Sequence, residues 1–465
     1  MQEFPLKTVH IVGIGGVGVS AIAEMLLSFG VNVQGSDALE GANTRRLEVK
    51  GVKIFIGHKA ENIEGADCVV ASTAVPEDNP ELVAARKKGL PVGRRSEILA
   101  EILRYKQGIC VSGTHGKTTT SSLITHILKE TGLHPSCIVG GILNSCQSNA
   151  VCDTGRYLVV EADESDETFL KLPTTISVVT NVNPEHIVYH YGSYEKYKGA
   201  FELFVRNTAF YGYSVLCIDH PEVKKIYEKV QDRRLISYGF DTGAQISAKN
   251  VHGYDDKTTF DVVINLPDQK DVWEGVCLSL IGRHNVQNAL AAIGVSLALG
   301  LKKKEIIKAL GCFLGVQRRL TKRAEIGGVK IFDDYAVHPV EIDTTLTAVK
   351  DITHHGKVIA VFQPHRYTRM ADVWDDFMTA FSKADTVIVA DIYACGEKPI
   401  AQYTQDKMIE QMSKHHKNVF KLEKLTDLAD MIKKHAKSGD TVICLGAGTI
   451  SAACKEAVAV LEGEK

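Results

Sequence analysis

A strand, a glycine turn and a helix follow one another between residues 109 and 128, and this stretch constrains the fold most. Residues 109–112 read as a short strand, and Lys117 opens a helical pattern of apolar positions. The backbone N–H groups of such a turn, together with the N-terminus of the helix, form a cradle for phosphate oxygens. The strict P-loop pattern has a glycine where this chain has Val111, so the match is to a shortened variant of the motif.

An ordinary strand-turn-helix connection that contains two glycines is the alternative interpretation of this stretch. Gly-Lys-Thr at a strand-to-helix junction is the context that the phosphate-binding motif requires, so we favour a nucleoside triphosphate site. Lys117 would reach the outer phosphates, and the hydroxyl of Thr118 would bind a magnesium ion. The predicted nucleotide-binding residues of this loop are Gly113, Thr114, His115, Gly116, Lys117, Thr118 and Thr119.

A second glycine-rich turn stands near the N-terminus. The strand-like residues 8–12 lead into the glycines of residues 13–18, and an acid, Asp37, ends a second strand about 20 residues further on. This β-α-β pattern predicts a ligand with a diphosphate and a ribose. A nicotinamide dinucleotide and a UDP-linked molecule satisfy it equally, and tight helix–sheet packing without a ligand is a third interpretation. The candidate binding residues at these strand ends are Gly15, Gly16, Val17, Gly18, Ser36, Asp37 and Ser72.

Acidic residues crowd the end of the apolar strand at residues 157–161. Four carboxylates occur within the six residues 161–166. Such crowding is unfavourable unless a cation shares the site, so we predict a magnesium ion that bridges phosphate oxygens, with Glu161 as its best-placed ligand. A solvated acidic loop is the alternative. A similar strand at residues 176–180 is followed by His186, which is a candidate ligand of a second metal ion.

Polar residues also begin the apolar helix predicted near residue 289. His284, Asn285 and Asn288 lie within one helical turn and share a face. Their amide and imidazole groups would contact the edge of an adenine, or would only cap the helix.

The last third of the chain starts a new α/β pattern. Its four strand-like runs end in polar or glycine residues, so one edge of a third sheet should face a ligand. Arg366 and Arg369 are three residues apart in a predicted loop, and this spacing suits the binding of a carboxylate or a γ-phosphate. One of the two would equally pair with a structural acid. The four runs are residues 329–332, 358–362, 386–390 and 441–445.

The length of 465 residues predicts about three domains. We place the boundaries in the polar links after residues 106 and 320. The expected class is α/β, with an N-terminal Rossmann-like domain at 1–106, a central P-loop ATPase-like domain at 107–320 and a C-terminal Rossmann-like domain at 321–465.

The charge balance and the cysteines restrict the partners. Lysine and arginine number 54 against 56 aspartates and glutamates, which argues against a nucleic-acid-binding surface. The eleven cysteines include no Cys-x-x-Cys pair and fit free thiols in a reducing compartment. No secretory signal is visible, and the longest apolar stretch, 289–301, is too short for a bilayer. We expect a cytoplasmic protein without a nucleic-acid or membrane partner, either a monomer or a homodimer.

Seven motifs, read in order, give the chain a resemblance to the Mur ligases of peptidoglycan synthesis. They cover essentially the whole length, and within this family the chain is most similar to the ligase that adds L-alanine. The resemblance implies a UDP-binding domain, an ATPase domain and a third domain that closes over the nucleotide. The motifs occupy residues 13–20, 113–120, 161–166, 183–186, 282–285, 333–335 and 362–369.

The resemblance implies an ATP-dependent amide ligase. A lactyl carboxylate of UDP-N-acetylmuramate would attack the γ-phosphate of ATP, and the amine of L-alanine would attack the resulting acyl phosphate. The implied cofactors are ATP and Mg²⁺. Catalysis of this kind rests on positioning and charge neutralisation, because two negatively charged groups must meet.

The residues carried over from the family fall into four groups. The implied catalytic residues are Lys117, Glu161, His186 and Arg319, and the implied metal ligands are Thr118, Glu161 and His186. Outside the phosphate loop, the nucleotide would contact His284, Asn285, Asn288, Arg319 and Asp334. The substrates would contact the N-terminal candidates given above and His338, Arg366 and Arg369.

Three positions depart from the family pattern. Val337 stands where a histidine is usual, Phe201 where sister ligases have a carbamoylated lysine, and Thr449 where an acid often ends a glycine loop. The first departure bears on the choice of amino acid.

Three other functions remain as alternatives. A nicotinamide oxidoreductase would leave the phosphate loop unused. A ligase that recycles murein peptides usually has tyrosine in place of Ser165. A non-catalytic nucleotide-binding regulator would need no second metal site.

Overall fold

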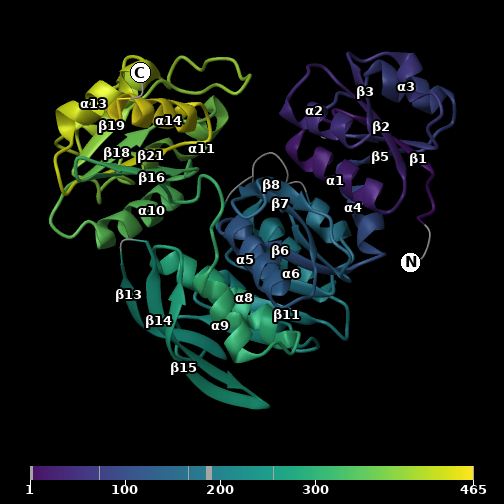
Figure 1. Cartoon of the computed structure of the whole chain (residues 1–465), viewed down its shortest axis with the longest axis horizontal. Helices are drawn as coiled ribbons and strands as arrows, with labels where there is room; N and C mark the ends of the chain where they lie inside the picture. The colour runs from purple at the N-terminus through teal and green to yellow at the C-terminus, as the bar shows by residue number, and fades with distance from the viewer. Residues whose placement is uncertain (1–3, 73, 166, 185–190, 255, 464–465) are drawn as a thin grey trace. The chain divides into compact units, whose positions relative to one another are not determined.

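The computed structural model describes residues 4–463 apart from 73, 166, 185–190 and 255. The described strands form three sheets with helices packed against them, so the predicted three-domain α/β fold is confirmed (Figure 1). The chain divides into two compact units. The first comprises residues up to 249, 261–274 and 287–314, and the second comprises 250–260, 275–286 and the residues from 315 onward. The boundaries after residues 106 and 320 stay predictions.

The N-terminal sheet has five parallel strands. Its strands are β1 (Thr8–Val12), β2 (Asn32–Asp37), β3 (Lys53–Ile56), β4 (Cys68–Ala71) and β5 (Val92–Arg94), and its helices are α1 (Val17–Ser28), α2 (Ala42–Val49), α3 (Pro80–Lys87) and α4 (Arg95–Leu103). The strand order is β3-β2-β1-β4-β5, and all pairs are parallel. The order reverses beside β1, so the glycine loop that follows this strand lies at a topological switch point, where such sheets bind ligands.

A buried carboxylate, Glu81 on α3, contacts residues of β1 and β2 and the segment that follows β3. Its Oε2 accepts a hydrogen bond from Ser36 Oγ (2.5 Å) and lies 3.3 Å from His10 Nε2. Its Oε1 accepts from Asn62 Nδ2 (2.5 Å) and from the backbone N–H of Lys59 (3.3 Å). Burial acts to raise the pKa of Glu81, but the hydrogen bonds from these partners outweigh it and lower the pKa to about 2.

We expect the protein to lose stability as the pH is lowered from about 4.5 to about 2, because of Glu81. The pKa of Glu81 is about 2 in the folded chain against an ordinary 4.5. Its contribution is therefore complete above pH 4.5 and is lost as the pH falls through 2. The difference corresponds to about 3 kcal/mol of unfolding free energy.

Urea unfolding at about pH 6 and about pH 3 measures this effect. The Glu81→Gln variant should lose less of its unfolding free energy between the two pH values than the wild-type protein does. Glu61→Gln, which changes an exposed glutamate nearby, is the control and should behave as wild type. Equal losses in all three proteins would contradict the prediction.

The central sheet has ten strands in the described chain. The strands are β6 (Gln107–Ser112), β7 (Ser136–Leu143), β8 (Ser148–Val151), β9 (Tyr157–Glu161), β10 (Ile176–Val179), β11 (Tyr213–Cys217), β12 (Leu235–Gly239), β13 (Ile246–Gly253), β14 (Thr258–Leu266) and β15 (Gln269–Leu278). The helices are α5 (Lys117–Glu130), α6 (Tyr194–Arg206), α7 (Pro221–Lys229), α8 (Arg283–Ala298) and α9 (Lys303–Gly311). β6 pairs in parallel with both β9 and β10, so the carboxyl ends of these three strands are neighbours.

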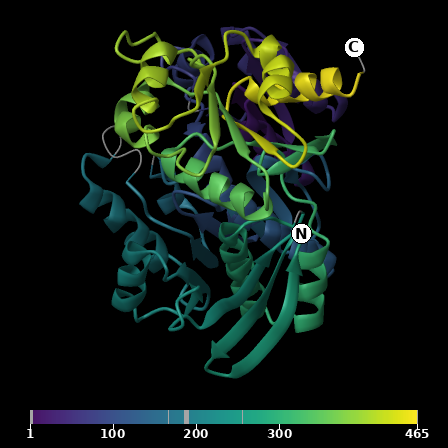
Figure 2. The ribbon, with the colours of Figure 1, turned by 90° about the vertical axis from the view of Figure 1, so that its left-hand side faces the viewer.

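The sequence patterns had indicated only three of these ten strands, namely β6, β9 and β10. The long strands β13, β14 and β15 lie side by side at one end of the sheet (Figures 1 and 2). A sequence signal for a strand was available in β14, where buried and partly exposed residues alternate from Thr258 to Ile264.

The C-terminal sheet has six strands. They are β16 (Thr321–Ile326), β17 (Val329–Asp334), β18 (Val358–Phe362), β19 (Thr386–Val389), β20 (Val419–Lys421) and β21 (Thr441–Leu445), and the helices are α10 (Pro339–Ile352), α11 (Tyr367–Phe377), α12 (Gln405–Met412), α13 (Leu428–His435) and α14 (Ile450–Leu461). The order is β16-β17-β21-β18-β19-β20, and only the pair β16–β17 is antiparallel. Alternate residues of the strands enter two separate cores, one on each face. None of the helices in the described chain is long and apolar enough to span a bilayer.

Candidate active site

The loop between β6 and α5 has the backbone geometry of a phosphate cradle. Gly113 (φ +134°) and Gly116 (φ +83°) adopt left-handed conformations that favour glycine. A Cβ atom on Gly113 would lie 2.0 Å from Thr180 Oγ1, and one on Gly116 would lie 2.7 Å from Asn288 Oδ1. Helix α5 begins at Lys117 with no acidic residue in its first turn, so its N-terminal N–H groups suit an anion.

The residues that follow β10 anchor this loop. Thr180 Oγ1 donates to the backbone carbonyl of His115 (2.6 Å). The backbone N–H of His115 donates to Asn181 Oδ1 (2.8 Å). The N–H of Thr114 donates to the carbonyl of Asn181 (3.1 Å), and the N–H of Asn183 donates to Thr114 Oγ1 (2.8 Å). The sequence did not mark these three anchors as site residues. The available signal was their position directly after a strand that neighbours β6.

The ammonium group of Lys117 points into its own loop. Nζ donates to the carbonyls of Gly113 (2.6 Å) and Thr114 (3.2 Å) and to Glu164 Oε1 (2.9 Å). Burial acts to lower the pKa of Lys117, but nearby carboxylates, Glu164 first among them, outweigh it and raise the pKa above its ordinary value. Lys117 is therefore a charged group held at the mouth of the cradle.

The acidic loop after β9 is not a solvated one, so that alternative is wrong for its described residues. The side chain of Glu164 is 2% exposed, and burial raises its pKa to about 7 although Lys117 opposes the shift. Burial also acts to raise the pKa of Asp163, but Lys117 and the N–H of Ser165 outweigh it and lower the pKa. Tyr191 Oη donates to the backbone carbonyl of Glu164 and so holds the loop in place.

Thr118 and Glu161 form an oxygen pair at the first turn of α5. Thr118 Oγ1 donates to Glu161 Oε1 (2.9 Å) and lies 3.1 Å from Oε2, while the N–H of Gly140 donates to Oε2. Hydroxyl and carboxylate oxygens are ligands that Mg²⁺ binds in proteins. The described residues contain no group of three or more histidine, cysteine, aspartate or glutamate side chains that would hold a metal ion. His186 lies outside the described residues.

The first turn of α8 carries the predicted adenine residues. Asn285 Nδ2 donates to the carbonyl of Ile281 (2.7 Å), as a residue that caps the start of a helix does. Thr120 Oγ1 on α5 donates to Asn288 Oδ1 (3.2 Å), so this amide contacts the helix that follows the cradle. Contact of His284, Asn285 and Asn288 with adenine stays a prediction.

Arg319 and Asp334 lie close together beside the end of β17. Asp334 accepts from the N–H of Leu320 (2.6 Å) and of Ala336 (2.8 Å). Burial raises the pKa of Asp334 to about 6 although Arg319 opposes the shift. Burial and Arg319 lower the pKa of His284 to about 4, which keeps this imidazole neutral. The structure thus brings together three of the predicted nucleotide-binding residues.

The N-terminal glycine loop is held by the acid that the fingerprint predicts. The N–H of Gly15 donates to Asp37 Oδ2 (2.8 Å), and Asn43 Nδ2 donates to the carbonyl of Gly15 (2.7 Å). Ser36 is fully buried, and its hydroxyl donates to Glu81 instead of facing a surface. The role of Ser36 toward a ligand stays a prediction.

The remaining N-terminal candidates lie around the same turn. Gly16 precedes α1, which begins at Val17, and a Cβ atom on Gly18 would lie 3.3 Å from Arg95 Cδ. Ser72 follows β4, and its Cβ lies 3.1 Å from the position of a Cβ on Gly13. The N-terminal candidates are therefore grouped at one edge of the sheet.

His338 begins helix α10 in the third sheet's domain. Its Nδ1 accepts from the N–H of Val340 (3.3 Å), and the side chain is 8% exposed. Its neighbour Val337, which replaces the usual histidine, is also buried, and its N–H donates to Glu341 Oε2 (3.1 Å). The substitution therefore places an apolar side chain in the family's histidine position.

The prediction that both arginines lie in a loop is wrong for Arg369. Arg366 (φ +67°) precedes α11, and Arg369 is in the first turn of this helix. The distance between Arg369 Nη1 and His365 Nδ1 is 3.1 Å. The helix begins here because Glu397 caps it, accepting from the N–H (3.0 Å) and hydroxyl (2.7 Å) of Thr368. Such a cap from 29 residues away leaves no local signal in the sequence.

Phe201 and Thr449, the other two departures, have structural contacts. Phe201 is fully buried, with its ring centroid 5.3 Å from that of Phe169 and 5.1 Å from that of Tyr197. Gln363 Nε2 donates to Thr449 Oγ1 (3.0 Å). The position of the sister ligases' carbamoylated lysine is thus part of an aromatic core.

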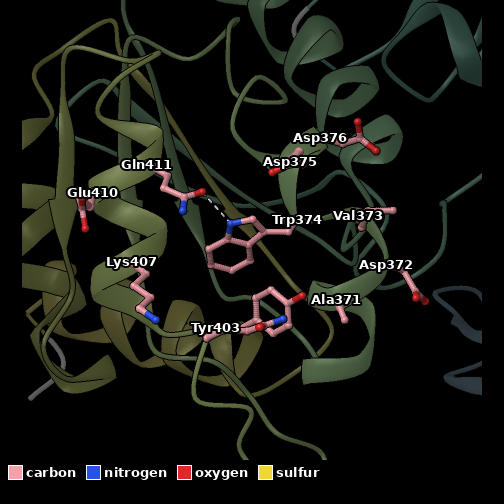
Figure 3. Close-up of a pocket in the computed structure, with 11 residues that line it drawn as sticks. Ala371, Asp372, Val373, Trp374, Asp375, Asp376, Tyr403, Lys407, Glu410 and Gln411 are labelled. Atoms are coloured by element: carbon pink, nitrogen blue, oxygen red, sulfur yellow. Dashed lines mark hydrogen bonds between the residues drawn. The ribbon is translucent and has the colours of Figure 1, made fainter.

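A surface cavity of about 650 Å³ lies between α11 and α12 (Figure 3). The rings of Trp374 and Tyr403 are 4.9 Å apart there, and Trp374 Nε1 donates to Gln411 Oε1 (2.7 Å). None of the predicted site residues lines this cavity.

Three family models match the chain in succession. They are described as "Mur ligase family, catalytic domain" at residues 8–107, "Mur ligase middle domain" at 111–296 and "Mur ligase, glutamate ligase domain" at 318–448. A curated protein of Phenylobacterium zucineum named UDP-N-acetylmuramate–L-alanine ligase is 48% identical over 96% of this chain and 94% of its own length. A protein of the same name from Mesorhizobium japonicum is 48% identical over 95% of each chain.

Solved structures agree with these matches. The UDP-N-acetylmuramate-alanine ligase MurC of Thermotoga maritima superposes with a TM-score of 0.82 and 29% identity, covering 99% of this chain and 100% of that one. A murein peptide ligase of Psychrobacter arcticus superposes with a TM-score of 0.69 and 22% identity over 98% of each chain, and this likeness concerns the fold alone.

Proposed function

Because the chain belongs to the Mur ligase family, we propose that it joins L-alanine to the lactyl carboxylate of UDP-N-acetylmuramate and converts ATP to ADP and phosphate. The near-full-length similarity to relatives named for this reaction carries the proposal. The cradle around Lys117 supports it, because a nicotinamide oxidoreductase would have no use for such a loop. The nucleotide would be held by residues 113–119.

The chemistry requires a carboxylate to approach a γ-phosphate, and both groups are negative. The ammonium of Lys117 and the N–H groups at the start of α5 reduce this repulsion by binding phosphate oxygens. The carbonyls of Gly113 and Thr114 already orient the ammonium toward the cradle. Less reorganisation is then needed when the charge shifts during phosphoryl transfer.

Thr118 and Glu161 would hold Mg²⁺, which when bound neutralises phosphate charge and aligns the phosphate oxygens. The fit rests on their oxygen donors, which lie 2.9 Å apart at the start of α5. His186 is proposed as a ligand of a second ion by its motif alone.

The other proposed contacts are grouped by ligand: ATP, the amino acid and UDP-N-acetylmuramate. For ATP, Arg319 would bind the γ-phosphate and Asp334 the ribose, with His284, Asn285 and Asn288 beside the adenine. For the amino acid, the guanidinium groups of Arg366 and Arg369 suit its carboxylate. His338 is a further proposed contact, and it follows Val337, the residue that departs from the family pattern. For UDP-N-acetylmuramate, the N-H groups of the glycine turn suit the diphosphate. Its proposed contacts are Gly15, Gly16, Val17, Gly18, Ser36, Asp37 and Ser72.

Phosphate release with UDP-N-acetylmuramate, ATP and Mg²⁺ across a panel of amino acids tests the proposal. We expect L-alanine to give the highest rate and mass spectrometry to detect one new amide linkage. A ready-made murein peptide is included as a competing amine, because it is the acceptor of the alternative recycling ligase. A higher rate with that peptide, or no amide product at all, would contradict the proposed reaction.

The proposed setting is the cytoplasm, where ATP and the UDP-linked precursor occur together. We propose a monomer or a homodimer that works without a nucleic-acid or membrane partner. Light scattering of the purified protein would distinguish the two oligomeric states.

A further inference from the structure

Glu164 is a buried carboxylate to which the proposed reaction gives no role. Its side chain is 2% exposed, and its Oε1 accepts from Lys117 Nζ at 2.9 Å. Its Oε2 is buried and has no hydrogen-bond partner among the described residues. A buried carboxylate oxygen without a partner is unfavourable, so this arrangement costs stability in the nucleotide-free protein.

Glu164 occupies a hydrogen-bond donor of Lys117 that a bound phosphate would need. An ammonium group has three N–H donors, and Lys117 directs them at the carbonyls of Gly113 and Thr114 and at Glu164. A phosphate oxygen gains a hydrogen bond from Lys117 only by replacing one of these acceptors. The two carbonyls belong to a backbone that the residues after β10 hold in place. The carboxylate is the acceptor that side-chain rotation releases.

We propose that Glu164 takes the place of a phosphate oxygen on Lys117 in the nucleotide-free protein and is exchanged for the nucleotide on binding. This inference rests on the proposed function, because it takes ATP as the ligand of the cradle. Glu164 is then a positioning residue: it keeps the ammonium at the mouth of the loop and reduces the affinity for ATP.

The exchange has a consequence for protons. The charged groups that face Glu164 are Lys117 on α5 and Asp163 on its own loop, and the pKa of Glu164 is already about 7 while Lys117 is paired with it. When Lys117 turns to the phosphates, Glu164 loses its cation and gains a nearby anion, and both changes favour its protonated form. A proton is then taken up from solvent as ATP binds near neutral pH.

Calorimetry with ATP and Mg²⁺, without UDP-sugar or amino acid, tests the inference. The Glu164→Gln variant should bind ATP about tenfold more tightly than wild type, since a neutral amide neither holds Lys117 as strongly nor repels the phosphates. Glu167→Gln is the matched control, because it removes the same charge from an exposed position three residues away and should leave the affinity unchanged. An affinity of Glu164→Gln equal to or below that of wild type overturns the inference.

Wild-type protein supplies a second readout that does not depend on the folding of a variant. Titrations near pH 7 in two buffers of different ionisation enthalpy should reveal proton uptake on ATP binding, and the uptake should be smaller in Glu164→Gln. Binding of ATP to wild type without proton uptake overturns the exchange alone. A wild-type protein that does not bind ATP at all refutes the proposed function instead.

Discussion

Replacing Lys117 with alanine is expected to lower kcat for phosphate release by about a thousandfold or more while the binding of UDP-N-acetylmuramate stays unchanged. The alanine variant lacks the ammonium that would bind the γ-phosphate in the transition state. The UDP-sugar would bind at the N-terminal glycine turn, which belongs to a different sheet. The fold should tolerate the change, since Glu164, the buried partner of Lys117, has a pKa of about 7 and accepts a proton readily.

Steady-state phosphate release and calorimetry with UDP-N-acetylmuramate measure the two effects separately. Lys129→Ala is the matched control, because this exposed lysine stands in the last turn of the same helix, α5. It should keep both activity and binding. Loss of UDP-sugar binding together with turnover in Lys117→Ala would contradict the assignment of the two ligands to separate domains.

The sequence predicted the parts of the site whose geometry is local. A glycine turn between a strand and a helix adopts its conformation because of its own residues, so the loop at Gly113–Gly116 was recognisable without knowledge of the fold. Thr118 and Glu161 were each predicted as magnesium ligands from a local pattern, the threonine of a phosphate loop and an acid at a strand end, and they are in contact in the structure.

The parts that the sequence did not predict depend on partners distant in the chain. Thr180 and Asn181 anchor the phosphate loop only because β10 pairs with β6 across 60 to 70 residues of chain. The pairing of Lys117 with Glu164 spans 47 residues. Neither residue type nor spacing reveals such contacts, because they depend on strand order, which no local pattern specifies.

The strands β7, β8 and β11–β15 were missed for a different reason. A strand is most readily recognised in the sequence when it ends in a chemically distinctive loop, and these strands do not. Several of them are also amphipathic, and a strand with one exposed face has a weaker apolar signal than a buried one. The residue patterns and the family resemblance both indicated the α/β class, but neither supplied the bounds of these strands.

Replacing Gly113 with alanine is expected to destabilise the protein by about 3–5 kcal/mol and to remove ATP-dependent activity. Two effects add at this position. The φ of +134° lies in a region that alanine rarely adopts, and the new Cβ would lie 2.0 Å from Thr180 Oγ1, far inside van der Waals contact. Relief of the clash requires a movement of Thr180, whose hydroxyl holds the carbonyl of His115 (2.6 Å). The cradle would therefore lose its anchor as well as its backbone conformation.

A matched glycine separates the two effects. Gly132 also has a positive φ (+76°), but a Cβ atom there would meet nothing within 4 Å. Gly132→Ala should therefore show only the backbone strain, about 1–2 kcal/mol, and should keep its activity. Urea unfolding and phosphate release of both variants measure the difference. Equal losses of stability would mean that the contact with Thr180 does not hold the loop, and a fully active Gly113→Ala would mean that nucleotide binding does not need the backbone geometry of this turn.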